Sequence, residues 1–290
     1  MDAKAADRAG EVIATARHSL TMIEDLPTAI RPMTEADGYA VQAIHLRQLA
    51  KLIGSRGSIG GYKVGLVSAQ MRAACGGTAT LGFDAPVFGG VLVERTVRGS
   101  ATVPYAQAIS PFVEGEFAVR IGADVPRASA PYTRDSVATF VEACAGGIEI
   151  VDPRLRYFDF KPPLAPLMVA DDGSNWGVVV GEGRTDWRNL DLRAARCTLA
   201  KNGQAIASGV GADLQGHPFE VLAWLANALL ARGSMLRRGD VVLLGSVTPS
   251  YTDLDDDCEI VCAWDTLGSC RVRFTGKLTD VQKRNRFSPT

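Results

Sequence analysis

One segment, PFVEGEFAVRI at positions 111–121, constrains the fold of this 290-residue chain more than any other. Successive side chains of a β-strand point to opposite faces of a sheet, so residues two apart share a face. As a strand, the segment turns Val113, Phe117 and Ile121 towards one face, which is uniformly apolar. It turns Glu114 and Glu116 towards the other face, side by side. The segment therefore predicts a sheet that is packed on one side and carries two neighbouring carboxylates on the other.

A third carboxylate, Glu149, stands in an apolar strand-like run, GIEIVD at 147–152. A charge in such a run is costly to bury unless it is paired, and two neighbouring carboxylates repel each other. A bound cation removes both conflicts. Three carboxylates without a nearby His or Cys pair favour a hard, oxygen-preferring ion, Mg²⁺ or Mn²⁺. The residue types leave one alternative open, a surface pair of Glu114 and Glu116 with a salt-bridged Glu149.

A lysine is placed in a similar way in the strand-like run at 61–66. Lys63 shares its face with Gly61 and Gly65, and glycines in a strand often mark a site where a ligand approaches the backbone. A lysine beside a metal-bound acid can pair with the carboxylate of that acid or move protons. The alternative for Lys63 is an exposed strand lysine.

The sequence divides into a helical N-terminal region, residues 1–56, and a β-rich core, residues 57–290. Apolar residues at helical spacing predict helices over 3–20 and 34–53, with Thr34 as the N-cap of the second. Further helices are expected over 134–145 and 216–231, and strands over 61–66, 111–121, 147–152, 178–180, 240–244 and 260–274. The Asn202-Gly203 pair predicts a hairpin within 195–210, because both residues tolerate positive φ. The pattern as a whole predicts an α+β fold.

Composition excludes several classes of partner. Lys and Arg number 31 against 32 Asp and Glu, so we expect no nucleic-acid binding, which needs a basic surface. No apolar run reaches the ~18 residues of a membrane span, and the N-terminus is too polar for a signal peptide, so we expect no membrane partner. The six cysteines form no C-x-x-C pair. They are expected to be small buried side chains of a protein from a reducing compartment, the cytoplasm.

Short motifs occur in a fixed order along most of the chain. They are GYKVGL at 61–66, FDAPVFG at 83–89, VEGEFA at 113–118, IEIVDPR at 148–154, VADDGS at 169–174, the stretch 216–227, LRRGD at 236–240 and LGS at 267–269. By these motifs the chain resembles the 2-keto-4-pentenoate hydratase and 4-oxalocrotonate decarboxylase family, a branch of the fumarylacetoacetate hydrolase superfamily. Order and spacing together carry the resemblance, since each motif alone is short.

The resemblance implies a fold and a set of site residues. The fold is a mixed β-sandwich roll of the fumarylacetoacetate hydrolase C-terminal-domain type, with a helical N-terminal part. The implied site residues are three ligands of a divalent metal (Glu114, Glu116 and Glu149), two catalytic residues (Lys63 and Asp84) and two residues of the substrate pocket (Ser174 and Thr248). Trp176 stands where the family pattern has a glycine, so we expect it to reshape the pocket wall and contact the substrate.

The implied activity is that of a metal-dependent lyase, a hydratase that adds water to a small 2-hydroxydienoate or 2-keto-enoate through a metal-stabilised dienolate. A decarboxylase of the 4-oxalocrotonate type reaches the same dienolate by losing CO₂ and stays open as the alternative. Trp176 and the Pro-rich segment 157–168 also leave open a related reaction on a larger keto acid. A C–C hydrolase of acylpyruvates and a non-catalytic partner subunit are less favoured. The resemblance further implies a homo-oligomer, which can associate with an enzyme of the same pathway.

Overall fold

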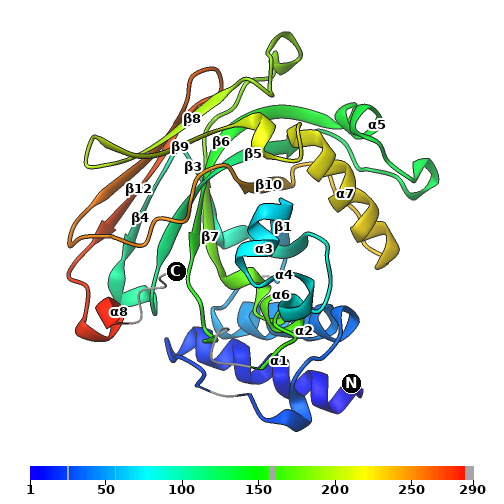
Figure 1. Ribbon diagram of the computed structural model, residues 1–290, viewed down its shortest axis with the longest axis vertical. Helices are drawn as coiled ribbons and strands as arrows, with labels where there is room; N and C mark the ends of the chain where they lie inside the picture. Colours follow the sequence, from blue (N-terminus) through cyan, green and yellow to red (C-terminus); the bar gives the residue numbers. More distant parts are fainter. Residues whose placement is uncertain (25, 56, 157–160, 285–290) are drawn as a thin grey trace.

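Two β-sheets with helices around them make up the computed structural model, which describes residues 1–24, 26–55, 57–156 and 161–284 (Figure 1). The larger sheet has seven strands in the order β2 (Val87–Leu92), β1 (Ile59–Gly65), β10 (Val241–Ser246), β5 (Phe112–Ile121), β6 (Val141–Val151), β7 (Asn175–Val180) and β3 (Thr96–Arg98). The smaller sheet has five strands in the order β4 (Ser100–Pro104), β12 (Gly268–Thr275), β11 (Glu259–Trp264), β8 (Arg196–Lys201) and β9 (Gln204–Val210). Both sheets mix parallel and antiparallel neighbours, because β1–β10, β3–β7 and β4–β12 are parallel pairs. The α+β prediction is confirmed.

The N-terminal segment contributes the two long helices α1 (Ala3–His18) and α2 (Glu35–Leu52), which lie together at the lower end of Figure 1. Thr34 caps α2 as predicted, since its side chain accepts a hydrogen bond from the Asp37 amide. The two helices pack unusually closely at Gly10, where an added Cβ would lie 2.5 Å from the side chain of Ile44. This close packing brings the C-terminal end of α1 next to the larger sheet.

Shorter helices join the strands. They are α3 (Ala69–Ala74), α4 (Gly77–Leu81), α5 (Arg134–Ala138), α6 (Ala165–Ala170), α7 (Pro218–Ala231) and α8 (Asp280–Arg284). His217 caps α7 through a hydrogen bond from the Phe219 amide, in agreement with the helix start expected there. Residues 157–160 of the Pro-rich segment lie outside the described residues, and its later part enters α6.

The apolar face of β5 forms part of the main core, as predicted. Val113, Phe117 and Ile121 are completely buried, and the ring of Phe117 packs edge-on against Trp264 of β11 with 5.3 Å between the ring centroids. Side chains of β8, β11 and β12 complete the same cluster. The smaller sheet therefore covers the back of the strand whose front carries the two glutamates.

One element was predicted wrongly. The helix expected over 134–145 ends at Ala138, and β6 begins at Val141. The Thr133 cap is present, but Val141, Cys144 and Ala145 are buried in the larger sheet, where β6 pairs along its length with β5. Tertiary pairing has overridden local helix preference in this stretch. The hairpin between β8 and β9 forms as predicted, with Asn202 and Gly203 both at positive φ.

None of the helices that the structure describes combines the length and the apolar character that a membrane span requires.

Candidate active site

Three carboxylates meet on the face of the larger sheet that is turned away from the smaller one. Glu114 and Glu149 are direct cross-strand partners in the β5–β6 pair, and Glu116 follows two residues further along β5. One oxygen of each carboxylate lies within 4.8 Å of an oxygen of the others. The alternation of side chains along β5 thus produces the cluster that the sequence predicted.

Each carboxylate is oriented by neighbours from other strands and loops. The Oε1 atom of Glu149 accepts hydrogen bonds from Lys63 Nζ at 3.1 Å and from Asn175 Nδ2 at 2.9 Å. The Oε2 atom of Glu116 accepts one from the Gly245 amide at 3.0 Å, and the Oε1 atom of Glu114 accepts one from the Ser250 hydroxyl. The cluster is therefore held in place by residues from β1, β7, β10 and the segment that follows β10.

The charges in this cluster are not balanced. Burial and the negative charge of Glu149 raise the pKa of Glu114 to about 6, and burial, Glu149 and Glu114 hold the pKa of Glu116 well above its ordinary value. Burial alone would lower the pKa of Lys63, but the carboxylates of Glu149, Glu114 and Glu116 outweigh it and raise that pKa. One ammonium group faces three carboxylates. A hard divalent cation with carboxylate ligands restores the balance, so these residues fit Mg²⁺ or Mn²⁺.

Lys63 is in the position that the alternation of β1 predicted, and it is only 6% exposed. Its ammonium group lies against Gly173, because a Cβ added to this glycine would be 2.8 Å from both Cε and Nζ of Lys63. Gly173 is the middle one of three successive residues with positive φ, Asp172, Gly173 and Ser174, which precede β7. This turn holds the chain close to Lys63, and it ends at Asn175, the second partner of Glu149. The alternative of an exposed Lys63 is thereby excluded.

The remaining predicted site residues lie around the carboxylate cluster without touching it. The Thr248 hydroxyl accepts a hydrogen bond at 2.9 Å from the amide of Gly115, the residue between the two glutamates. The Ser174 hydroxyl donates to Asp171 Oδ2 at 3.3 Å. Thr248 therefore holds the backbone between two of the glutamates, whereas Ser174 binds within its own turn. The contact of both residues with substrate stays a prediction.

Trp176 follows Asn175 at an irregularity in the pairing of β6 with β7, and its side chain packs against the main hydrophobic core. Its indole N–H donates to the Gln107 carbonyl at 2.9 Å, and the Arg95 guanidinium lies 3.9 Å from the ring centroid. These contacts lie away from the carboxylate cluster. The predicted role of Trp176 in substrate binding is not supported by any contact with the cluster.

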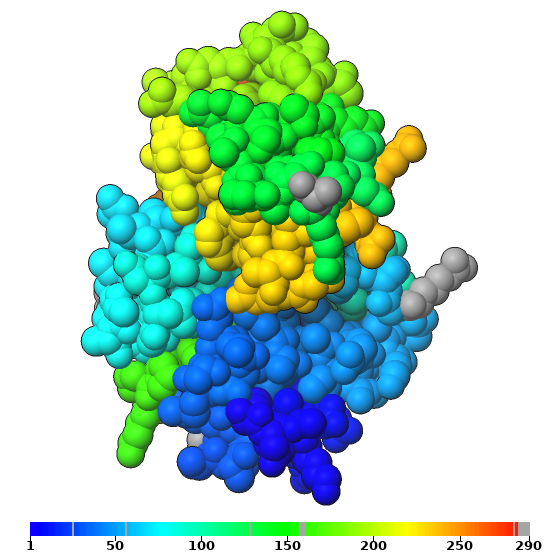
Figure 2. Space-filling view, turned by 90° about the vertical axis from the view of Figure 1, so that its right-hand side faces the viewer, coloured from blue at the N-terminus to red at the C-terminus, as the bar shows by residue number. Residues whose placement is uncertain are grey.

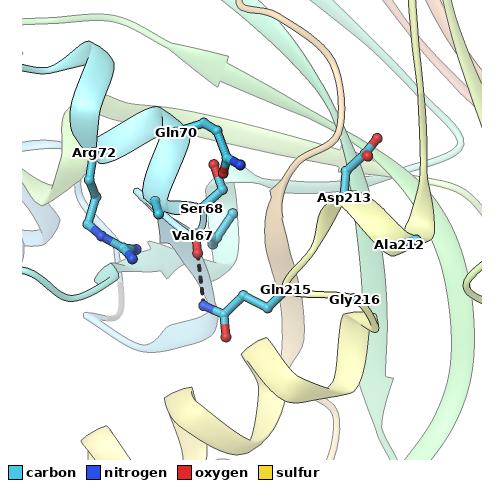
Figure 3. A pocket seen from close by; sticks show the side chains of 9 residues that line it. Val67, Ser68, Gln70, Arg72, Ala212, Asp213, Gln215 and Gly216 are labelled. Carbon is cyan, nitrogen blue, oxygen red and sulfur yellow. Dashed lines mark hydrogen bonds between the residues drawn. The ribbon is translucent and has the colours of Figure 1, made fainter.

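Asp84 is bound to Arg72, which lines a cavity of about 650 Å³ between residues 67–72 and residues 212–216 (Figure 3). Its side chain is 63% exposed and forms an ion pair at 2.5 Å with Arg72, one of the residues that line the cavity. Val67, another lining residue, packs against Gly245, whose amide binds Glu116. Gln215 reaches across from the other wall and donates to the Val67 carbonyl, as Figure 3 shows. The cavity is thus two contacts away from a predicted metal ligand.

A second cavity, of about 890 Å³, lies between α2, α7 and the strands β1 and β2. Figure 2 shows α7, in yellow to gold, directly above the blue surface of α2. Tyr62, the neighbour of Lys63 in β1, lines this cavity together with Tyr39 and Phe88. Alternate residues of β1 therefore face two separate spaces, and only one of these spaces contains the carboxylates.

Asn175 and Ser250 are the two contributors that sequence reasoning missed. Asn175 could have been found, because it stands between two residues already selected, Ser174 and Trp176. Ser250 follows β10 in a segment with no periodic pattern, so nothing in the sequence indicated that its hydroxyl reaches Glu114.

Comparison with known proteins gives a consistent result. The family model described as fumarylacetoacetate (FAA) hydrolase C-terminal matches residues 94–275, which include all three carboxylates. The chain belongs to the fumarylacetoacetate hydrolase family. The resemblance inferred from the motifs is therefore confirmed.

Individual relatives in the family are similar over most of their length. The chain is 34% identical over 245 residues to the 2-hydroxyhexa-2,4-dienoate hydratase of Comamonas testosteroni, covering 84% of this chain and 87% of that protein. It is 30% identical over 243 residues to the 4-oxalocrotonate decarboxylase of Pseudomonas putida, covering 83% and 86%. The solved structure of the 4-oxalocrotonate decarboxylase of Pseudomonas putida G7, complexed with magnesium and adipate, matches with a TM-score of 0.82 at 26% identity, covering 94% of this chain and 98% of that one.

Proposed function

We propose that this protein is a divalent-metal-dependent hydratase of a small 2-hydroxydienoate or 2-keto-enoate. The observation that carries the proposal is the buried cluster of Glu114, Glu116 and Glu149, with the ammonium group of Lys63 at 3.1 Å from Glu149. A 2-hydroxydienoic acid offers a carboxylate and a neighbouring oxygen, a pair of oxygen donors that suits a cation held by three carboxylates. Relatives named as hydratases of such acids support the same function.

The metal, Mg²⁺ or Mn²⁺, would be held by Glu114, Glu116 and Glu149 and would supply Lewis-acid stabilisation of negative charge on the substrate oxygens. Lys63 remains protonated, because three carboxylates raise its pKa, so it offers a fixed positive charge and a proton at Nζ. Asn175 and Lys63 hold Glu149 through the same oxygen atom, which keeps this ligand in one orientation. The protein part of the site thus fixes both the ligands and a proton donor before substrate binds.

The reaction consumes one water molecule. The 2-hydroxyl group of the dienol loses its proton and the terminal carbon, C5 in a five-carbon acid, gains one, which gives the 2-keto-enone. Water then adds across the C3–C4 double bond, with hydroxide at C4 and the remaining proton at C3. We assign Lys63 and Asp84 as the proton-transfer residues, with Asp84 oriented by Arg72, which lines the adjacent cavity. Ser174, Thr248 and Trp176 are kept as the candidates for substrate contact.

Decarboxylation of a 2-oxo-enedioate is the second candidate. Loss of CO₂ from such an acid gives the same dienol, so an identical arrangement of ligands and ammonium group serves both reactions. The high structural similarity to a 4-oxalocrotonate decarboxylase favours this alternative, and a related reaction on a larger keto acid remains compatible with it.

The proposal also covers the domain boundaries, the fold type, the assembly and the location of the protein. We assign residues 1–56 as a helical region that supports a catalytic core of residues 57–290, with the two sheets forming the roll expected from the resemblance. We also propose a cytoplasmic homo-oligomer that acts on small molecules and can associate with an enzyme of its pathway.

The test uses two substrates and two variants. The protein is incubated with Mg²⁺ and either 2-hydroxypenta-2,4-dienoate or 2-oxohex-3-enedioate, and dienol absorbance and CO₂ release are followed. Glu114→Gln should abolish metal-dependent turnover, whereas Glu142→Gln, an exposed glutamate of β6 paired with Arg120, should leave it unchanged. Absence of turnover with both substrates would refute the proposed function, and full activity of the Glu114 variant would refute the assigned metal site.

A further inference from the structure

The turn formed by Asp172, Gly173 and Ser174 has an unusual set of supports. Residues other than glycine rarely adopt positive φ, and a run of such residues is stable only where the surroundings hold it. On one side, Arg154 donates to Asp171 Oδ1 at 2.7 Å, and the Gly90 amide donates to Asp172 Oδ1 at 2.8 Å. These contacts come from the sheet and its adjoining loops.

On the other side, the supports come from the two N-terminal helices. Arg17, near the end of α1, donates from Nη2 to the Trp176 carbonyl at 3.2 Å, and its Nη1 lies 3.8 Å from Asp172 Oδ2. His45 of α2 contacts the Ala170 carbonyl through Nδ1 at 3.1 Å. Since a carbonyl only accepts, Nδ1 carries the proton and Nε2 is left as an acceptor.

Three buried polar atoms in this region have no hydrogen-bond partner among the described residues. They are Arg17 Nη1, His45 Nε2 and Asp172 Oδ2. The three residues are at most 8% exposed, and a buried polar atom without a partner is costly. Burial, followed by the positive charges of Arg17 and Arg154, holds the pKa of His45 well below its ordinary value, so His45 is neutral.

One donor and two acceptors match the hydrogen-bonding capacity of a single water molecule. Such a water would accept from Arg17 Nη1 and donate to His45 Nε2 and Asp172 Oδ2, and the 3.8 Å separation of Arg17 Nη1 and Asp172 Oδ2 is short enough to be bridged. A direct ion pair of good geometry would be shorter than this.

We propose that Arg17 and His45 are positioning residues of the active site, which bind one buried water with Asp172 and thereby hold the 172–174 turn against Lys63. The helical N-terminal region then acts on catalysis through a defined chain of contacts. Arg17, His45 and the water fix Asp172, the turn places Gly173 on the Lys63 ammonium group, and Asn175 follows on Glu149. No residue of α1 or α2 needs to touch the substrate for this effect.

The test compares Arg17→Met with Arg8→Met, a matched change at an exposed position of α1. Hydrogen exchange of backbone amides in residues 165–180 should be at least about tenfold faster in the Arg17 variant only, because the turn loses its support. The kcat should fall roughly 10- to 100-fold, the range seen when residues that orient a metal site are removed. The Mn²⁺ dissociation constant should change by less than about threefold, since Glu114 and Glu116 belong to β5 and not to the turn.

Two further measurements keep the proposal falsifiable. Arg17→Lys, which retains a positive donor, should recover most of the exchange protection and of kcat. A high-resolution crystal structure of the wild-type protein should show water density bonded to Arg17, His45 and Asp172. The expected change in kcat rests on the proposed function, whereas hydrogen exchange, Mn²⁺ binding and the buried water do not. These three measurements therefore test the proposal even if the protein turns over neither substrate. Unchanged exchange in the Arg17 variant, or loss of activity only in proportion to lost Mn²⁺ sites, would overturn it.

Discussion

The contact between Gly173 and Lys63 predicts an unusual effect of a very small substitution. In Gly173→Ala the new Cβ would lie 2.8 Å from Cε and Nζ of Lys63, and the residue would keep its positive φ of 56°. The left-handed conformation costs roughly 1 kcal/mol for a residue with a Cβ. The steric clash adds little to this, because Nζ is the free end of a flexible side chain.

The consequence for catalysis is much larger than the consequence for stability. To reach an ordinary contact of 3.4 Å, the ammonium group must move by about 0.6 Å, away from the place where it contacts Glu149 at 3.1 Å. A displacement of about 1 Å in a catalytic group can cost roughly 100-fold in rate, so we expect kcat to fall about tenfold or more. The variant should therefore be folded and able to bind metal, but its kcat should be low.

Gly99→Ala is the matched control. Gly99 has a φ of 71°, and a Cβ added there would have nothing within 4 Å, so this variant suffers the backbone strain without the clash. Both variants should lose a similar, small free energy of unfolding in urea titrations, and only Gly173→Ala should lose kcat. Equal kcat values in the two variants would refute the idea that Lys63 can occupy its position only because Gly173 has no side chain.

Three further predictions concern the carboxylates. Glu116→Gln relieves like-charge repulsion, so without metal it should melt at least as high as the wild type in calorimetry, whereas added Mg²⁺ should stabilise only the wild type. Burial raises the pKa of Asp172 to about 7 in the folded protein. A carboxyl group with a raised folded-state pKa destabilises the protein as the pH rises from the pKa of the unfolded chain to that of the folded one, so between pH 5 and 7 the wild type should lose about 1.4 kcal/mol of unfolding free energy per pH unit relative to Asp172→Asn. A difference in unfolding free energy that stays constant with pH in urea titrations would contradict this. If Asp84 transfers protons, Asp84→Asn should lower kcat roughly 100-fold without changing the affinity for Mn²⁺. An unchanged pH–rate profile would refute this role and show that Asp84 only pairs with Arg72.

Periodic patterns in the sequence predicted the parts of the site that depend on strand alternation. Glu114, Glu116 and Lys63 face inward because their strands alternate apolar and polar or glycine residues, and this pattern depends only on neighbouring residues. Thr34, Asn202 and Gly203 were predicted for a similar reason, since caps and tight turns use local chemistry.

Contacts between distant segments could not be predicted in this way. Ser250 reaches Glu114 from a segment without periodicity, and Arg17 reaches the 172–174 turn from a helix more than 150 positions away in the sequence. The start of β6 was assigned to a helix for the same reason, because residues 141–145 become a strand only through pairing with β5. Local preference carries no information about such partners.

The arrangement of the larger sheet also has a consequence for how the protein folds. Lys63 lies on β1, and β1 reaches the carboxylate strands only through β10, which pairs with it in parallel from the other end of the chain. Pairings between such distant segments close large loops and form slowly. The cation-binding cluster can therefore acquire its ammonium partner only after the C-terminal strand of the sheet has been added. The three carboxylates themselves lie on the paired strands β5 and β6, so they can meet before β1 is in place, and Lys63 joins the site last.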